Sequence, residues 1–187
     1  MKPVMFIHIP KTAGISIYET LLPTCEMSFL MHCTSWQYRK HFGHEQWEAA
    51  FKFCFIRNPW EWLVSFYKYH NAEHKHITIT NRPFDRWIME VVGNVPKASR
   101  QHEHQLDQWQ YFTDAEDNLM VDFIGRFENL QHDFKHVCKC IGIDNIELLH
   151  KNKSEHGHYS TYYNDETRDA VTRAFPKLIS FGDYTFG

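Results

Sequence analysis

The chain has 187 residues, a formal net charge of -3 at pH 7 and 14 histidines. This length supports one domain with a substantial core, so we expect a single domain over residues 1–187. The slightly acidic balance argues against a protein that binds nucleic acid through bulk positive charge. No run of 18 apolar residues is present, so we expect no membrane span, and no signal peptide is recognisable.

The cysteines favour a reduced protein. There are five of them, an odd number, and no two form a CxxC pair: Cys25, Cys33, Cys54, Cys138 and Cys140. This usage is typical of intracellular proteins rather than of secreted disulfide-linked ones. We therefore expect a cytoplasmic location. Nothing in the composition indicates the oligomeric state.

The first predicted element is an apolar run from Val4 to Ile9, which is typical of a buried strand. Pro10 should end the strand, because proline cannot donate a hydrogen bond to a sheet. Small residues follow and allow close approach of a ligand to the backbone: Thr12, Ala13, Gly14 and Ser16. Ile17 and Leu21 then recur at helical spacing. A strand, a tight loop and a helix in this order aim several N–H groups and a helix dipole at one spot.

Lys11 adds a full positive charge to this loop, so the sequence predicts a binding site for phosphate or sulfate. The loop is not a Walker A motif, which needs a glycine, four residues and then Gly-Lys-Ser/Thr. Here the lysine stands three residues before Gly14. A small nucleotide-dependent kinase is thereby disfavoured. An ordinary strand-to-helix turn with a solvated lysine stays open as an alternative.

The next predicted elements lead to a second strand-turn-helix. Cys25 to Met31 is a possible short strand, and a helix ending at Gly43 follows, with Thr34 or Ser35 as its N-cap. A short helix over Glu45 to Ala50 precedes a strong strand, Phe51 to Ile56. Arg57 and Asn58 close that strand, and Pro59 begins a helix, a favoured position for proline. In this helix one face is apolar, formed by Trp60, Leu63, Val64 and Tyr67.

The second half of the chain predicts a third strand and more helices. We expect a loop over 70–81, a helix over 83–92, a loop over 93–99, a strand over 119–126 and a helix over 129–141. An irregular segment over 152–163 should lead to a helix over 165–174, capped by Asn164 and ended near Pro176. Strands alternating with helices predict an α/β fold with parallel strands covered on both faces.

The loop sequence Pro10-Lys11-Thr12-Ala13-Gly14-Ile15-Ser16 resembles the 5′-phosphosulfate loop of sulfotransferases that use 3′-phosphoadenosine-5′-phosphosulfate (PAPS), and among them most closely the carbohydrate sulfotransferases. The resemblance implies a P-loop-like, three-layer α/β fold with a central, mainly parallel sheet flanked by helices. It also implies that residues 11–16 bind the donor. Ile15 stands where the family usually has threonine, which removes one hydroxyl contact.

A second resemblance lies in the segment from Phe55 to Tyr67. It is similar to the family's 3′-phosphate element, which has an arginine at the end of a strand and a serine eight positions later. Arg57 offers a planar fork and Ser65 a hydroxyl donor for a phosphate. Trp62 stands where the family often has a further arginine. A helix-capping Arg57 with a solvent-exposed Ser65 is the alternative.

Two weaker resemblances complete the set, which runs from residue 4 to about residue 181. The segment Ile124 to Leu130 is similar to a strand-to-helix junction of the family, with Glu128 as a structural acceptor and Arg126 near the nucleotide. The segment Asn152-Lys153-Ser154 is similar to a loop that folds over the nucleotide, which implies donor contacts from Lys153 and Ser154. A mobile polar loop is the alternative for this segment.

The implied reaction transfers a sulfuryl group to an acceptor hydroxyl. The resemblance alone implies that this hydroxyl belongs to a carbohydrate. Lys11 suits the bridging oxygen of the donor, and the loop amides suit its 5′-phosphate, so no metal is required. A base should take the hydroxyl proton. His32 is the candidate because it follows the second strand, at the edge where α/β clefts form. His104 and His102, with Glu103, are the reserve candidates near the acceptor.

Two further alternatives stay open. His132, His136 and Cys140 are spaced i, i+4, i+8 on one predicted helix face and could present ligands to zinc. Successive turns advance by about 5.4 Å, however, so one ion cannot easily reach all three, and a solvated polar face explains the same spacing. A sulfotransferase-like protein that binds nucleotide without turnover is also compatible with the sequence.

Overall fold

A computed structural model describes residues 2–73, 82–95, 107–144, 146–148 and 157–187. The chain divides into two compact units, the first made of Met1–Ile56 and Ser99–Lys153 and the second of Arg57–Ala98 and Ser154–Gly187. We describe each unit by itself. The single domain expected over residues 1–187 stays a prediction.

The first unit is built on a parallel sheet of four strands. They are β1 (Val4–Ile7), β2 (Met27–Leu30), β3 (Phe51–Ile56) and β4 (Phe123–Arg126), in the spatial order β2-β1-β3-β4. Each neighbouring pair is parallel; Val4, for example, lies opposite Met27 on one side and Phe51 on the other. This arrangement confirms the α/β class and the parallel strands expected from the sequence.

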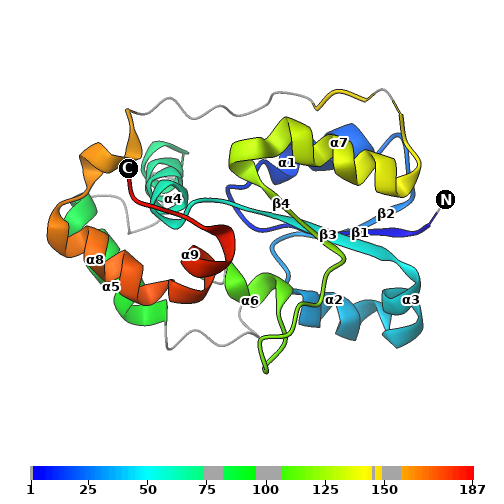
Figure 1. Cartoon of the computed structure of the whole chain (residues 1–187), viewed down its shortest axis with the longest axis horizontal. Coiled ribbons are helices and arrows are strands. Elements are labelled where there is room, and N and C mark those ends of the chain that lie inside the picture. Colours follow the sequence, from blue (N-terminus) through cyan, green and yellow to red (C-terminus); the bar gives the residue numbers. More distant parts are fainter. Residues whose placement is uncertain (1, 74–81, 96–106, 145, 149–156) are drawn as a thin grey trace. The chain divides into compact units, whose positions relative to one another are not determined.

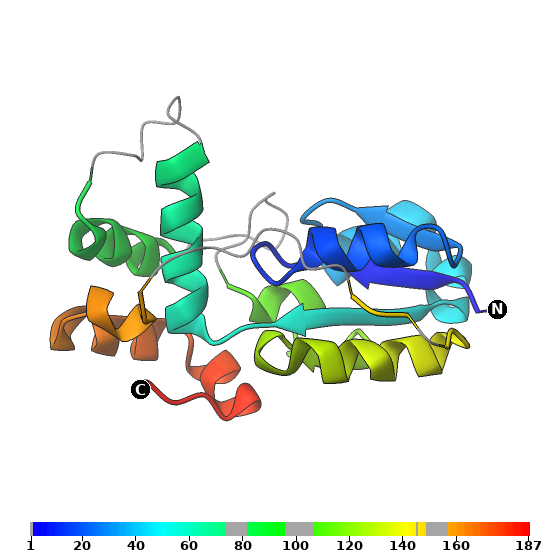
Figure 2. The same cartoon turned by 90° about the horizontal axis from the view of Figure 1, so that it is seen from above.

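Helices cover both faces of this sheet and make three layers (Figure 1). On one face lie α1 (Gly14–Leu21) and α7 (Leu130–Ile141); on the other lie α2 (Ser35–Phe42), α3 (His44–Ala49) and the short α6 (Trp109–Phe112). Figure 2 shows α1 and α7 running along the strands. The core between these helices and the strands includes Phe6, Ile17, Phe53, Phe134 and Val137. Apolar side chains from both sheet and helices thus form the core on this face, with Met27, Phe29 and Phe123 partly buried at its margin.

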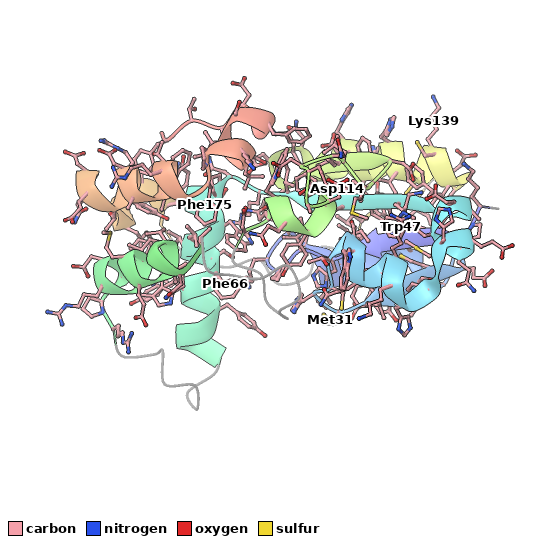
Figure 3. The ribbon with its side chains drawn as sticks, turned by 90° about the horizontal axis from the view of Figure 1, so that it is seen from below. Met31, Trp47, Phe66, Asp114, Lys139 and Phe175 are labelled. Carbon is pink, nitrogen blue, oxygen red and sulfur yellow. The ribbon has the colours of Figure 1, made fainter. Side chains whose placement is uncertain are left out.

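The opposite face contains two polar anchors. The Tyr38 hydroxyl of α2 donates to the Phe6 carbonyl (2.6 Å) and accepts from the Leu30 N–H (2.7 Å), which ties the helix to two strands. Lys52 of β3 is buried, and its Nζ donates to the carbonyls of Trp47 and Ala50. Trp47 points from α3 toward the strands, under the Lys52 ammonium (Figure 3). These contacts satisfy a cation that would otherwise be costly to bury.

The second unit is helical. It contains α4 (Pro59–Glu73), α5 (Phe84–Asn94), the 3₁₀ turn η3 (Tyr159–Tyr162), α8 (Asp165–Ala174) and α9 (Pro176–Gly182). Aromatic rings hold these elements together: Phe84 contacts Tyr67 and Tyr163 edge-on, with centroids 5.2 and 5.0 Å apart. The Tyr163 hydroxyl donates to the Trp60 carbonyl (2.9 Å), and the Trp60 indole donates to the Arg168 carbonyl (3.2 Å).

Helix starts were predicted better than helix ends. Asn164 is an N-cap as expected, and of the two candidates Thr34 and Ser35 it is Thr34 that caps its helix; both have full capping boxes, closed by Thr167 and Gln37. Helix α4 continues to Glu73, so the loop expected to begin at residue 70 was wrong for 70–73, and α5 continues to Asn94. The turn at Pro176 begins α9, because proline is also favoured in the first helical turn.

Strand ends were also overestimated. Strand β1 stops at Ile7, two residues before the predicted end, and β4 begins at Phe123 rather than at residue 119. Leu119 pairs with Thr113 in an isolated antiparallel bridge instead. The short helix α6 was not predicted, and a 3₁₀ turn, η2 (Phe127–Asn129), precedes α7. After β1 the apolar pattern marks burial, which continues to Ile9 beyond the residues that pair, whereas before β4 it does not, since Leu119 is 51% exposed.

Candidate active site

The candidate site lies at the carboxyl edge of the sheet in the first unit. The chain passes from β1 to β2 on one side of β1, and β3 lies on the other side, with β4 beyond it. In open α/β sheets, ligands bind at the carboxyl ends of the strands where the strand order reverses in this way. The loop that leaves β1 therefore begins at the position where the fold favours a ligand.

This loop is tightly bent. Lys11 (φ 63°) and Ala13 (φ 66°) both have left-handed backbone conformations, although neither is glycine. Each such residue costs about 1 kcal/mol or more, and strain of this kind concentrates at functional sites. Thr12 is buried and braces the bend, because its hydroxyl donates to the Ile9 carbonyl (2.8 Å). A left-handed residue followed directly by a helix start turns successive N–H groups toward one point, which suits an anion.

Lys11, Ile15 and Ser16 take different positions around the bend. Lys11 and Ile15 are partly exposed, whereas Ser16 is buried and its carbonyl accepts a hydrogen bond from the Thr20 hydroxyl (2.7 Å). Helix α1 has no side-chain N-cap, since Ala13 occupies that position. The first-turn N–H groups of a helix have no acceptor within the helix itself. An anion at the loop is the kind of partner that such a helix start accommodates.

Gly14 is required by its contact with His8. An ideal Cβ on Gly14 would lie 1.9 Å from both Cδ2 and Nε2 of the His8 ring. His8 follows β1 directly and is 3% exposed. Its Nδ1 has no hydrogen-bond partner among the residues that the structure describes. Burial, and secondarily the neighbouring His32, lowers the pKa of His8 to about 3, so this imidazole is neutral at physiological pH.

His32, the predicted base, lies next to His8. It follows β2, has a left-handed backbone (φ 54°) and is partly exposed. The two ring centroids are 4.8 Å apart with an interplanar angle of 47°. Within the first unit, the structure thus brings the predicted loop and the predicted base to one sheet edge, with His8 in contact with both.

His8 is the residue that sequence analysis underestimated. It is one of 14 histidines and lies within the run Val4 to Ile9, which was predicted only as a buried strand. A usable signal was present, because a polar residue interrupts the otherwise apolar run from Val4 to Ile9. The contact of its ring with Gly14 and His32 depends on chain segments that the linear pattern does not relate.

In the second unit, Arg57 directly precedes α4 and Ser65 lies within it. The Arg57 side chain is buried, and its Nη2 donates to Glu61 Oε1 (2.8 Å), one helical turn on. The Asn58 carboxamide oxygen accepts from the N–H of Trp60 (3.0 Å) and of Glu61 (3.3 Å). Asn58 therefore caps the helix, a role that was not predicted. Ser65 is 2% exposed, so the solvent-exposed alternative for this serine is wrong.

A buried arginine at a helix start can bind an anion, because the helix dipole and the guanidinium favour the same charge. A phosphate bound at Arg57 would accept hydrogen bonds from the same guanidinium that donates to the Glu61 carboxylate. The other predicted donor and acceptor contacts, Lys153, Ser154, His102 and His104, lie outside the described residues. Arg126, predicted near the nucleotide, pairs with Glu128 at 4.0 Å.

Two of the possible zinc ligands on α7, His136 and Cys140, contact each other, and the third, His132, contacts Asp133. His136 Nε2 lies 3.5 Å from Cys140 Sγ, and His132 Nδ1 lies 2.9 Å from the carboxylate of Asp133. In the part of the chain that the structure describes, no three His, Cys, Asp or Glu side chains gather as a metal site would require. Over the same residues, every helix is too short or too polar to cross a membrane.

Comparison with known proteins identifies the family of the chain. The sequence model of a family described as the sulfotransferase family matches residues 2–181, which is nearly the whole chain. An uncharacterized protein of Archaeoglobus fulgidus is 33% identical over 113 residues, covering 58% of this chain and 82% of that protein. The family match includes the loop after β1, the Arg57 segment and the residues up to α9.

Proposed function

Because the chain belongs to the sulfotransferase family, we propose that it transfers a sulfuryl group from PAPS to a hydroxyl group of a small-molecule acceptor, specifically a carbohydrate. The observation that carries this proposal is the strained loop between β1 and α1, with its left-handed Lys11 and Ala13. Such a loop, at the carboxyl edge of a parallel sheet, suits a phosphosulfate better than an apolar ligand.

The loop residues are proposed to bind the reacting end of the donor. Bound PAPS would supply the sulfuryl group and a phosphate as leaving group. The amides of residues 12–16 would donate to the 5′-phosphate, and Lys11 would stabilise the negative charge that grows on the leaving oxygen. One lysine and several fixed amides can provide this stabilisation, so the proposal includes no metal ion.

Arg57 and Ser65 are proposed to bind the 3′-phosphate of the same nucleotide. The burial of both residues supports this role, because a charge-assisted hydrogen bond is stronger away from water. The resemblance of their spacing to the family's element gives the second support. Lys153 and Ser154 are proposed as further donor contacts on the same resemblance.

His32 is proposed as the base on the acceptor side. As the new O–S bond forms, the acceptor hydroxyl must lose its proton, and an imidazole near neutrality can accept it. Its partial exposure allows an acceptor to reach it, whereas His8 is buried. His102 and His104 are proposed as acceptor contacts and stay the reserve candidates for the base.

Nucleotide binding tests the donor part of this proposal. Calorimetry should show that 3′-phosphoadenosine-5′-phosphate binds without a metal and raises the melting temperature of the chain, because a ligand that binds only the folded state stabilises it. Adenosine 5′-phosphate, which lacks the 3′-phosphate, should bind more weakly. Mg-ATP binding as tightly as the 3′-phosphorylated nucleotide would favour a phosphotransferase and contradict the proposal.

A further inference from the structure

A buried histidine occupies a place that phenylalanine would fill with less cost. The His8 ring stacks with Phe6 (centroids 5.7 Å apart) and with Phe29 (5.5 Å), inside an aromatic cluster. His8 is 3% exposed, and its Nδ1 has no partner among the described residues. A buried polar atom without a hydrogen bond is destabilising and calls for an explanation. Packing alone does not explain an imidazole here.

The orientation of the ring separates its two nitrogens. The ring meets Gly14 with its Cδ2–Nε2 edge, since these two atoms are the closest to an ideal Cβ on that residue. Nδ1 is the ring atom opposite this edge, so it faces away from Gly14. The loop therefore leaves Nδ1 for another partner.

The neighbouring group with the right chemistry is His32. Its ring centroid is 4.8 Å from that of His8, and the two rings are inclined by 47°. At this separation a modest rotation of the partly exposed His32 side chain can bring one of its ring nitrogens within hydrogen-bond distance of His8. Two imidazoles this close do not both carry a charge easily, and His8, which is the more buried, is the one that stays neutral.

We propose that His8 is a positioning residue for His32: its Nδ1 accepts a hydrogen bond from the imidazolium that forms when His32 takes the acceptor proton. This inference rests on the proposed function. In the step itself, the acceptor oxygen forms a bond to sulfur and its proton passes to His32. The bond from sulfur to the donor phosphate breaks, and the electron pair stays on the phosphate oxygen near Lys11. His8 gains no proton and forms no covalent bond.

A double-mutant cycle tests this pairing. His8→Phe keeps an aromatic ring and removes the acceptor nitrogen, so kcat should fall by about tenfold or more, while the affinity for 3′-phosphoadenosine-5′-phosphate changes by less than about twofold. In a His32→Ala background the same substitution should have almost no further effect, because its partner is already absent. His8→Asn, which places an amide oxygen near the Nδ1 position, should retain more activity than His8→Phe. His44→Phe, at an exposed histidine of α3, is the matched control and should leave kcat unchanged.

The possible results separate a positioning role of His8 from a role in supporting the loop, and both from a failure of the proposed function. Losses that multiply in the double variant, or a parallel loss of nucleotide affinity, would show that His8 only supports the loop, and would overturn the pairing. A His8→Phe enzyme with wild-type kcat would overturn it as well. If His8→Phe fails to fold, judged by its melting curve, the cycle is run with His8→Leu, which also lacks an acceptor nitrogen, and the same criteria apply. A wild-type chain without sulfuryl transfer to any acceptor would refute the proposed function, and the pairing with it.

Discussion

The contact between Gly14 and His8 gives the most direct quantitative prediction. Carbon atoms in van der Waals contact lie about 3.5–4.0 Å apart, whereas a Cβ on Gly14 would lie 1.9 Å from two atoms of the His8 ring. The ring would have to retreat by about 1.5 Å or more. It cannot do so freely, because it is 3% exposed and stacked with Phe6 and Phe29.

Gly14→Ala should therefore destabilise the chain by about 1–3 kcal/mol, the usual cost of overpacking a core. For a chain of this size, that corresponds to a fall in melting temperature of about 2–12 °C. The same change should weaken binding of 3′-phosphoadenosine-5′-phosphate, because the loop amides move with Gly14. Urea denaturation and differential scanning calorimetry measure the first effect, and titration calorimetry the second.

Gly93 is the matched control. It lies near the end of α5, and an ideal Cβ there meets nothing within 4 Å. Gly93→Ala should stabilise the helix by about 0.5–1 kcal/mol, because alanine loses less backbone entropy. In a His8→Ala background, Gly14→Ala should cost clearly less than in the wild type. A Gly14→Ala chain as stable as the wild type, or an equal cost in both backgrounds, would refute the steric reasoning.

Three further predictions follow from the site residues. His8 has a pKa of about 3 in the folded chain against 6.5 when unfolded, so the unfolded state binds more protons between these values. The free energy of unfolding should therefore fall as pH drops from about 6.5 to 3. In His8→Phe that part of the pH dependence should vanish from urea titrations, and a profile identical to that of the wild type would contradict this prediction. Arg57→Ala should weaken the binding of 3′-phosphoadenosine-5′-phosphate by about 1.5–3 kcal/mol and the binding of adenosine 5′-phosphosulfate little. Equal losses of binding free energy for both ligands, measured by calorimetry, would show that Arg57 does not bind the 3′-phosphate. Lys11→Ala should lower kcat strongly and also raise the dissociation constant of PAPS, because its charge acts before and during transfer; an unchanged kcat would exclude the proposed role.

Much of the fold was predictable because local signals coincide with tertiary ones. Phe51–Ile56 is apolar apart from Lys52 and is closed by Arg57 and Asn58, and the strand has these bounds. Thr34 and Asn164 carry their capping signals within four residues, so their helices begin as predicted. Residues whose conformation depends on distant partners were harder to predict from the sequence. Lys52, for example, is buried in β3 and bound by Trp47 and Ala50, which the alternation of residues does not reveal.

The site shows the same division. The bend after β1 was predictable from Pro10 and the small residues that follow, because their chemistry is local. The place of His32 followed from its position after a strand. The contacts of His8 with Gly14 and His32 were not predictable, since they require β1, α1 and β2 to be brought together. The pairing of Arg57 with Glu61 was missed because only helical side-chain geometry relates two such residues.

The central claim is that this chain transfers sulfuryl groups, and transfer from radiolabelled PAPS to a panel of sugar and small-alcohol acceptors tests it most directly. Wild-type protein should label at least one acceptor. His32→Ala should lower that rate by about 10²–10⁴-fold, the usual contribution of general base catalysis, with nearly unchanged affinity for PAPS. Labelling by wild type that persists at near-normal rate in His32→Ala would contradict the assignment of the base. The absence of labelled product from the wild type with every acceptor would contradict the claim itself.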